Sequence, residues 1–281
     1  MTQFVVYDVF SNAPFGGNQL AVIPDATGIP EDDLQMIARE FNFSETTFVY
    51  PPVDPKNTAK IRIFTPTVEI PFAGHPTIGT AIALRDRGNH GDMILELGIG
   101  SIPCRFQGDM ASFTTSAALE RIAMPEIPLV ARALRLSPDQ ISTKNHAPVQ
   151  ATIGLPFVFV ELTDKAALDV CQPDVDAIRE GATKHPAGMD FAVYAYTRNG
   201  SNIDARMFAP LDNIPEDPAT GSAAATLAML LAQTLGTPQT LTIIQGEKMG
   251  RRSVIHAQSD GKNSTISGTA VKTMQGDLVY S

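Results

Sequence analysis

An internal duplication is the feature that most constrains how this chain can fold. The segments Arg62–Ala81 and Arg206–Ala225 share one skeleton, and they start 144 residues apart (206 − 62 = 144). In both, an arginine and a phenylalanine precede a proline, and an Ile-Pro pair then leads into a run of small and apolar residues. The tripeptides at 48–50 and 192–194 repeat the same spacing. A repeat on this scale predicts two similar halves, each with its own copy of one structural unit.

Each half combines many short strands with one apolar helix. Runs rich in Val, Ile, Phe and Tyr, such as 3–10, 60–64 and 203–208, predict strands. The segments 76–85 and 222–235 have almost no polar face, which indicates buried helices. We therefore predict an α+β fold in which each half is a buried central helix wrapped by a barrel-like mixed sheet. A doubly wound sheet would need amphipathic helices between successive strands, which the pattern does not supply.

The duplication also predicts where the domains divide and where a ligand binds. We expect one half-domain over 1–120, completed by a C-terminal strand within 264–281, and a second over 121–263. Duplicated halves pack naturally about a pseudo-twofold axis. The two motif turns would then face each other across an inter-domain cleft, where ligand sites tend to form.

Composition excludes several function classes. The chain has 281 residues and a net charge of −9 without clusters of Lys or Arg, which argues against nucleic acid and anionic membrane as partners. No apolar run approaches the roughly 20 residues of a membrane span, and the N-terminus lacks a signal-peptide pattern, so we expect a cytoplasmic protein. The two cysteines, Cys104 and Cys171, predict buried thiols rather than a disulfide or a zinc site.

Both motif turns lead into the N-terminus of a predicted buried helix. Such ends present unpaired backbone N–H groups and a partial positive charge, so they bind anions such as a substrate carboxylate. Gly74 and Gly221 would let a ligand approach the backbone closely, or they serve only to form tight turns. Ser222 would either donate a hydrogen bond to the carboxylate or cap its helix.

Three titratable residues are candidates for acid–base chemistry. His75 stands at the start of the first helix, as a proton donor at the anion site or as a structural histidine. Glu45 lies in a segment with three phenylalanines, and partial burial among them would make it a general base; otherwise it is an exposed strand residue. Asp217 would pair with His75 and orient it, or only cap a helix. The carboxylates Glu69 and Glu216 compete for these roles.

Nothing in the sequence indicates a metal or a nucleotide cofactor. The five histidines show no ligand spacing, and no glycine-rich phosphate motif or G-x-S-x-G sequence is present. We therefore expect acid–base catalysis without a cofactor.

Three motifs resemble one known family. They are Arg-x-Phe-Thr-Pro-x-x-Glu-x-Pro-Phe-Ala-Gly-His-Pro-Thr-x-Gly at 62–79, Ser-Glu-Thr-Thr-Phe at 44–48 and Glu-Asp-Pro-Ala-Thr-Gly-Ser-Ala at 216–223. Together with Asp8-Val-Phe, Gly17-Asn18, Gln245-Gly and Gly250-Arg251, they are similar to the PhzF-like phenazine-biosynthesis isomerase family over the whole chain.

The resemblance implies a fold, an activity and a set of site residues. The family has the fold of diaminopimelate epimerase and is commonly dimeric. Its best-known member isomerises trans-2,3-dihydro-3-hydroxyanthranilate without a cofactor, by moving a proton between carbons. By this resemblance, Glu45 is the catalytic base and acid, and His75 and Asp217 assist it. The implied substrate-binding residues are Asn18, Ser44, Gly74, Thr220, Gly221 and Ser222.

We thus expect a homodimeric, cytoplasmic isomerase that acts on a small carboxylate-bearing molecule. The epimerases that share the fold use a cysteine in each turn; the turns here carry none, so two-cysteine racemisation is not expected. Gln19 and Arg252 stand where members often have proline, so the substrate need not be the phenazine intermediate. The alternatives are a one-base epimerase or racemase, and a non-catalytic module that binds a small molecule or a protein.

Overall fold

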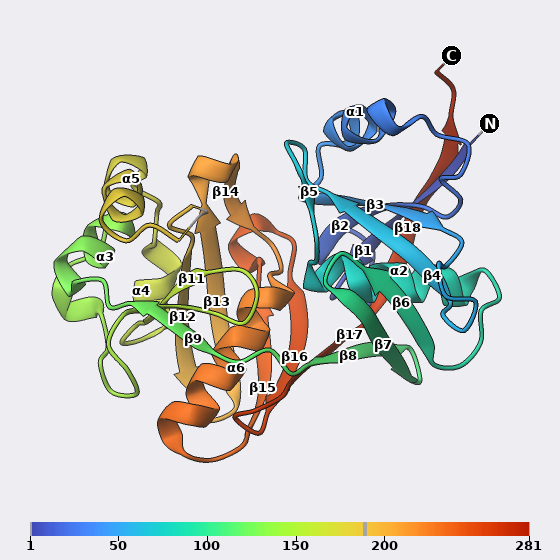
Figure 1. Cartoon of the computed structure of the whole chain (residues 1–281). Helices are drawn as coiled ribbons and strands as arrows, with labels where there is room; N and C mark the ends of the chain where they lie inside the picture. The colour runs from blue at the N-terminus through green and yellow to red at the C-terminus, as the bar shows by residue number, and fades with distance from the viewer. Residues whose placement is uncertain (1, 188–189, 281) are drawn as a thin grey trace. The chain divides into compact units, whose positions relative to one another are not determined.

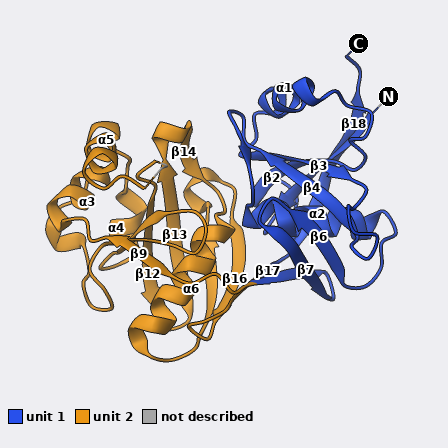
Figure 2. Cartoon of the chain, viewed as in Figure 1, with its two compact units in different colours: residues 1–114, 267–281 blue, residues 115–266 orange. Residues whose placement is uncertain are grey.

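The chain folds into two compact units. A computed structural model describes residues 2–187 and 190–280. Unit 1 contains Met1–Thr114 and Ser267–Ser281, and unit 2 contains Thr115–Ile266 (Figure 2). The predicted divisions, at 120/121 and 263/264, lie a few residues from these boundaries. Unit 1 is therefore built from both ends of the chain, whereas unit 2 is one continuous stretch.

Unit 1 is a mixed sheet with one long buried helix and one shorter helix (Figure 1). Its strands pair in the order β18, β1, β2, β3, β4, β6, β7 and β8, and β5 pairs with β4. The pairs β2/β3 and β4/β6 are parallel and the others are antiparallel. The strands are β1 (Thr2–Val9), β2 (Asn18–Ile23), β3 (Glu45–Tyr50), β4 (Ala59–Phe64), β5 (Glu69–Ile70), β6 (Met93–Leu97), β7 (Gly100–Gln107), β8 (Met110–Thr115) and β18 (Ala270–Leu278), and the helices are α1 (Glu31–Phe41) and α2 (Gly74–Asp86).

Unit 2 repeats this arrangement. Its strands pair in the order β9, β10, β11, β12, β13, β15 and β16, and β14 pairs with β13. The strands are β9 (Glu120–Ala123), β10 (Val149–Thr152), β11 (Phe157–Glu161), β12 (Val193–Asn199), β13 (Asn202–Ala209), β14 (Ile214–Asp217), β15 (Gln239–Gln245) and β16 (Ser253–Ser259), and β17 (Ser264–Gly268) spans the boundary to unit 1. The helices are α3 (Ile127–Ala133), α4 (Lys165–Val170), α5 (Val175–Lys184) and α6 (Gly221–Leu235), with short 3-10 turns η1 (Pro138–Gln140), η2 (Pro210–Asp212) and η3 (Glu247–Met249).

The strand directions support the duplication. The parallel pair β2/β3 corresponds to β11/β12, and the parallel pair β4/β6 corresponds to β13/β15. In each unit the long buried helix connects the second of these pairs. The predicted mixed α+β class is confirmed; the barrel-like wrapping and the pseudo-twofold axis stay predictions.

The two long helices are buried, as their apolar sequences predicted. Helix α2 is buried from Gly74 to Leu84 and contacts β1, β2, β3 and β6 of its own unit. Helix α6 is buried over most of its length and contacts β10, β15 and β16. Gly79 permits the close packing of α2, because a Cβ atom there would lie 2.6 Å from side-chain atoms of both Leu20 and Val9. None of the helices in the described residues has the length and apolar character needed to span a membrane.

Several predicted element boundaries were wrong. Helix α2 begins at Gly74, two residues before the expected start, so His75 lies inside its first turn; Pro76 fits there because first-turn N–H groups lack helical partners. The predicted last strand is interrupted at Thr269, whose carbonyl accepts a hydrogen bond from Phe10 N. The short helices α3 and α4 were missed because each spans two turns or fewer and has no long periodic pattern.

The structure also corrects the alignment of the two halves. Arg62 binds Glu69, and the matching Arg206 binds Glu216, which is 147 residues later rather than 144 (216 − 69 = 147). The turn between phenylalanine and glutamate has four residues in unit 1 (65–68) and seven in unit 2 (209–215). The three additional residues shift everything after the turn, so the Ile70-Pro71 match with Ile214-Pro215 was wrong.

The corrected alignment places different residues at equivalent positions. Gly74 corresponds to Gly221, since each is the first residue of its buried helix. In the preceding strands, Arg62 pairs with Phe48 and Arg206 pairs with Ala195. The repeat of 48–50 therefore lies at 195–197 and not at 192–194.

Candidate active site

In unit 1 the structure places Glu45 on the face of the sheet that packs against α2. Side chains alternate along β3, and the Thr47 hydroxyl lies 2.9 Å from the Thr80 hydroxyl of α2. Glu45, two residues earlier, shares that face. Phe48 points to the opposite face, where its ring packs edge-on against Phe64.

The sequence predicted that Glu45 is buried among the three phenylalanines of its segment. This prediction was wrong for Phe48, which lies on the other face of the sheet. Phe41 lies with its centroid 5.1 Å from Phe4, and 5.9 Å from Phe43. The neighbour that defines the setting of Glu45 is instead a histidine of α2.

Glu45 and His75 form a close, largely buried pair. His75 Nδ1 lies 3.2 Å from Glu45 Oε2, and the two side chains are 4% and 15% exposed. The second ring nitrogen of His75, Nε2, is buried and makes no hydrogen bond to any residue that the structure describes. Burial lowers the pKa of His75 to about 3, so the imidazole is neutral at physiological pH.

A neutral imidazole carries one N–H donor and one acceptor nitrogen, and its two tautomers exchange these roles between Nδ1 and Nε2. In either tautomer the buried Nε2 of His75 therefore offers a donor or an acceptor to a ligand. The contact between Nδ1 and Glu45 Oε2 places this imidazole directly beside the carboxyl group.

The other predicted residues of unit 1 lie beside this pair. Asn18 is buried at the start of β2, and its Oδ1 accepts a hydrogen bond of 3.2 Å from Ser44 Oγ. Ser44 directly precedes Glu45, whose position in β3 pairs with Leu20 of β2. Gly74 begins α2, which has no side-chain cap and no acidic residue in its first turn. The structure thus brings all five predicted residues of unit 1 to one end of β2, β3 and α2.

In unit 2 the predicted residues form the turn between β14 and α6. Asp217 and Thr220 are both buried, and Thr220 Oγ1 donates a hydrogen bond to Asp217 Oδ2. Gly221 begins α6, and Ser222 is its second residue. Like α2, helix α6 has no side-chain cap and no acidic residue in its first turn. The expected pairing of Asp217 with His75 stays a prediction.

The two turns carry different residues at equivalent positions. In the corrected alignment His75 is equivalent to Ser222, and Asp217 is equivalent to Ile70. Glu45 is equivalent to Ala192, because both directly precede the strand residues that pair with Phe64 and Phe208. The Glu–His pair of unit 1 thus has no titratable counterpart in unit 2.

The competing carboxylates have structural roles. Glu69 receives two hydrogen bonds from Arg62, and Glu216 receives two from Arg206. Each arginine also stacks on the phenylalanine of its own motif, at 5.1 Å in unit 1 and 4.9 Å in unit 2. These repeated clusters fix the turn in each unit.

Both cysteines are unsuited to acid–base chemistry. Burial raises the pKa of Cys104 to about 12 and that of Cys171 to about 12, so both thiols stay protonated at neutral pH. Cys104 lies in β7 and Cys171 directly follows α4, away from the two motif turns in sequence. The expectation of buried thiols is confirmed.

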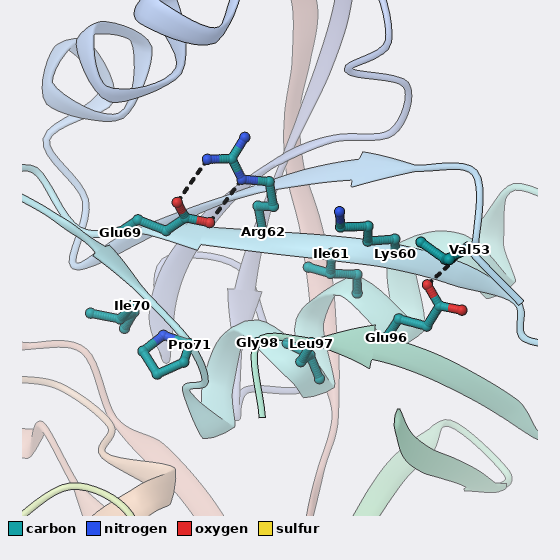
Figure 3. Close-up of a pocket in the computed structure, with 10 residues that line it drawn as sticks. All are labelled: Val53, Lys60, Ile61, Arg62, Glu69, Ile70, Pro71, Glu96, Leu97 and Gly98. Atoms are coloured by element: carbon teal, nitrogen blue, oxygen red, sulfur yellow. Dashed lines mark hydrogen bonds and ion pairs between the residues drawn. The ribbon is translucent and has the colours of Figure 1, made fainter. Parts of the chain in front are cut away.

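A separate pocket in unit 1 does not contain the candidate residues. It has a volume of about 310 Å³ and lies against β4, between β5 and the end of β6 (Figure 3). Figure 3 shows Arg62 bound to Glu69 on one side and Glu96 bound to the Val53 backbone on the other. Arg62, Glu69 and Glu96 line the pocket, and each is already held by one of these contacts. The pocket therefore offers no acid–base pair comparable to Glu45 and His75.

The chain is similar to known proteins over almost its whole length. A family model described as "Phenazine biosynthesis-like protein" matches residues 7–276. An uncharacterized isomerase of Mesorhizobium japonicum is 38% identical, with 98% of each chain covered. The trans-2,3-dihydro-3-hydroxyanthranilate isomerase of Pseudomonas aeruginosa is 35% identical, covering 96% of this chain and 95% of that protein.

Solved structures share the fold. A phenazine biosynthesis protein of the PhzF family from Bacillus anthracis superimposes with a TM-score of 0.88 at 22% identity, over 99% of each chain. A hydroxyproline epimerase from Agrobacterium vitis superimposes with a TM-score of 0.61 at 13% identity, over 98% of this chain and 91% of that one. The predicted likeness to epimerase folds is thereby confirmed at the level of architecture.

Proposed function

This chain belongs to the phenazine biosynthesis-like (PhzF) family and is an isomerase of that family, and we propose that Glu45 carries the proton in its reaction. The observation that carries the proposal is the buried Glu45–His75 pair, with Nδ1 and Oε2 3.2 Å apart. A positioned carboxyl group can take a proton from one carbon of a substrate and return it to another.

The substrate is a small molecule that bears a carboxylate. The uncapped starts of α2 and α6 supply backbone N–H groups and partial positive charge for an anion. Ser44, Gly74 and His75 Nε2 are the groups of unit 1 proposed to contact it. Thr220, Gly221 and Ser222 are proposed to contribute from unit 2, with Asp217 assisting the proton transfer.

The first compound to test is trans-2,3-dihydro-3-hydroxyanthranilate, because the 35% identical relative bears the name of its isomerase. It is incubated with the wild-type chain in D₂O, and mass spectrometry follows product formation and deuterium uptake. Glu45→Gln removes the carboxyl proton carrier but keeps the side-chain size. We expect turnover to fall by about 10²- to 10⁴-fold, the usual range for a positioned acid–base group.

Glu40→Gln is the matched control. Glu40 is exposed on α1, so the same chemical change there should leave turnover unchanged. If Glu45→Gln turns over substrate at the wild-type rate, Glu45 is not the proton carrier.

An epimerase acting through one base is the second candidate. A structure described as a predicted epimerase from Pseudomonas aeruginosa is 28% identical to this chain over its whole length. Ala192 and Ser222, which match Glu45 and His75, are not titratable, so the duplicated positions supply one acid–base pair rather than two. Chiral chromatography of the product separates the two: an epimerase inverts one stereocentre and leaves all double bonds in place.

The homodimer and a role in phenazine biosynthesis also remain proposals. Light scattering coupled to size-exclusion chromatography gives the mass of the particle directly. A particle of 30.1 kDa would be a monomer and would refute the homodimer. The proposed proton transfer does not depend on this result.

A further inference from the structure

Gln245 is a fully buried polar residue at the end of β15, and the acid–base scheme above does not use it. Its side chain is 1% exposed. Strand β15 is parallel to β13, as β6 is parallel to β4, and this correspondence makes Gln245 the counterpart of Leu97 in unit 1. The same position is therefore apolar in one unit and an amide in the other.

The Gln245 amide makes four hydrogen bonds, three of them to the turn that holds Asp217. Nε2 donates to the Asp217 backbone carbonyl at 2.8 Å and to Thr220 Oγ1 at 2.9 Å. Oε1 accepts from the Thr220 backbone N–H at 3.2 Å and from the Tyr194 hydroxyl at 3.3 Å. A backbone carbonyl only accepts and a backbone N–H only donates, so this orientation of the amide is fixed by chemistry.

These bonds also fix the direction of the Thr220 hydroxyl proton. A threonine hydroxyl has one proton to donate. Because Thr220 Oγ1 already accepts the N–H of Gln245, its own proton is directed to Asp217 Oδ2. The chain Gln245–Thr220–Asp217 thus ends in a hydrogen bond to the carboxylate, which stabilises its charged form.

Comparison with unit 1 shows that the shape of the turn does not require this network. In both units a glycine after the strand lets a proline of the turn approach: a Cβ atom on Gly98 would meet Pro71 Cα at 2.8 Å, and one on Gly246 would meet the Pro218 carbonyl at 2.7 Å. In unit 1 the residues equivalent to Gln245, Asp217 and Thr220 are Leu97, Ile70 and Ala73. The same turn is therefore built there with apolar residues alone.

We propose that Gln245 is a positioning residue that holds Asp217 ionised and in a single orientation by acting through Thr220. The proposal rests on the participation of Asp217 in the proposed isomerisation. A glutamine that served only to support the backbone would be needed equally in both units.

The experiment compares two substitutions of Gln245 with one matched control, using the D₂O assay described above. Gln245→Met keeps the length but removes all four hydrogen bonds, and Gln245→Glu keeps the acceptor side but loses both N–H donors. Leu97→Met makes the corresponding change in unit 1. We expect kcat to fall on the order of 10- to 100-fold for both Gln245 variants while KM changes less than about threefold, and we expect no change for the control.

A double-mutant cycle separates positioning from general support. Thr220→Val removes the hydroxyl through which Gln245 is proposed to act. If Gln245 acts through Thr220, Gln245→Met should lower kcat much less in the Thr220→Val background than in the wild type. Fully additive losses of kcat would overturn the proposal, as would wild-type kcat in both Gln245 variants.

Two measurements keep the outcome interpretable. Circular dichroism melting shows whether each variant folds; if Gln245→Met does not, the cycle is run with Gln245→Glu, which is isosteric with glutamine. Glu45→Gln is assayed in parallel: loss of turnover there with normal kcat in the Gln245 variants refutes only the role of Gln245. Normal turnover of Glu45→Gln refutes the proposed function itself.

Discussion

The buried His75 should make the fold sensitive to acid, and replacing it with glutamine should remove that sensitivity. Burial lowers the pKa of His75 from 6.5 in the unfolded chain to about 3 in the folded one. As the pH falls below 6.5, the unfolded chain takes up a proton that the folded chain does not. The folded state therefore loses stability from pH 6.5 down to about pH 3, and this loss is absent above pH 6.5.

The size of the effect follows from the difference between the two pKa values. Each pH unit between them changes the free energy of unfolding by about 1.4 kcal/mol. Between pH 7 and pH 5 the expected loss is about 2 kcal/mol, because most of that interval lies below the unfolded pKa. His75 is 4% exposed, so solvent screening reduces this figure little.

Urea unfolding followed by circular dichroism at pH 7, 6 and 5 tests this reasoning. The free energy of unfolding of His75→Gln, minus that of the wild type, should rise by about 2 kcal/mol from pH 7 to pH 5. His90→Gln is the control, since His90 is exposed. A difference that stays constant with pH would refute the neutral state of His75. A difference that falls in acid would show that His75 is an imidazolium paired with the Glu45 carboxylate.

Two further predictions concern the packing of each unit, and both are checked by urea or thermal unfolding. Gly79→Ala should destabilise the protein by about 1–3 kcal/mol, because the new methyl group would lie 2.6 Å from Leu20 and α2 must move to relieve the overlap. Arg206→Met should cost about 2–3 kcal/mol, since it leaves the 16% exposed Glu216 without its two hydrogen bonds. Arg62→Met, at a more exposed pair, should cost about 1 kcal/mol or less, and equal costs at both sites would contradict this account.

The fold class could be predicted because the repeat and the two apolar helices are properties of the sequence itself. The helices at 76–85 and 222–235 could be predicted to be buried because their sequences have almost no polar face. The short helix α4 could not be found in this way. Its position depends on tertiary contacts, such as the hydrogen bonds from Arg206 to the carbonyls of Leu168 and Cys171.

The alignment of the halves went wrong where the turn lengths differ. Arg62 and Phe64 match Arg206 and Phe208 at a spacing of 144 residues, and this match is structural. The Ile-Pro pairs at 70–71 and 214–215 have the same spacing only by coincidence. The signal for the correct alignment was present in the sequence as Glu-x-Pro-x-x-Gly, which occurs at 69–74 and again at 216–221. The binding of Glu69 and Glu216 by the two arginines, together with the helix starts and the strand pairing, shows which match has structural meaning.

The candidate residues of unit 1 lie together in the structure, but for a reason that differs in part from the one predicted. Sequence reasoning set Glu45 among phenylalanines, whereas strand alternation turns Phe48 to the other face and places His75 beside the carboxylate. Glu45 and Phe48 are three residues apart, and residues an odd number apart in a strand point to opposite faces of the sheet. The counterpart of Gln245 could not be found from the sequence, because Leu97 matches it only once β15 and β6 are aligned by their pairing.

The pairing of β1 with β18 has a consequence for synthesis of the chain. Thr2 pairs with Leu278 at one end of that ladder, so unit 1 cannot complete its sheet until β18 has left the ribosome. Unit 2 is continuous and can fold earlier. During that interval β1 presents an open edge, of the kind that pairs readily with other chains. The order of translation thus makes the half that carries Glu45 and His75 the last to be finished.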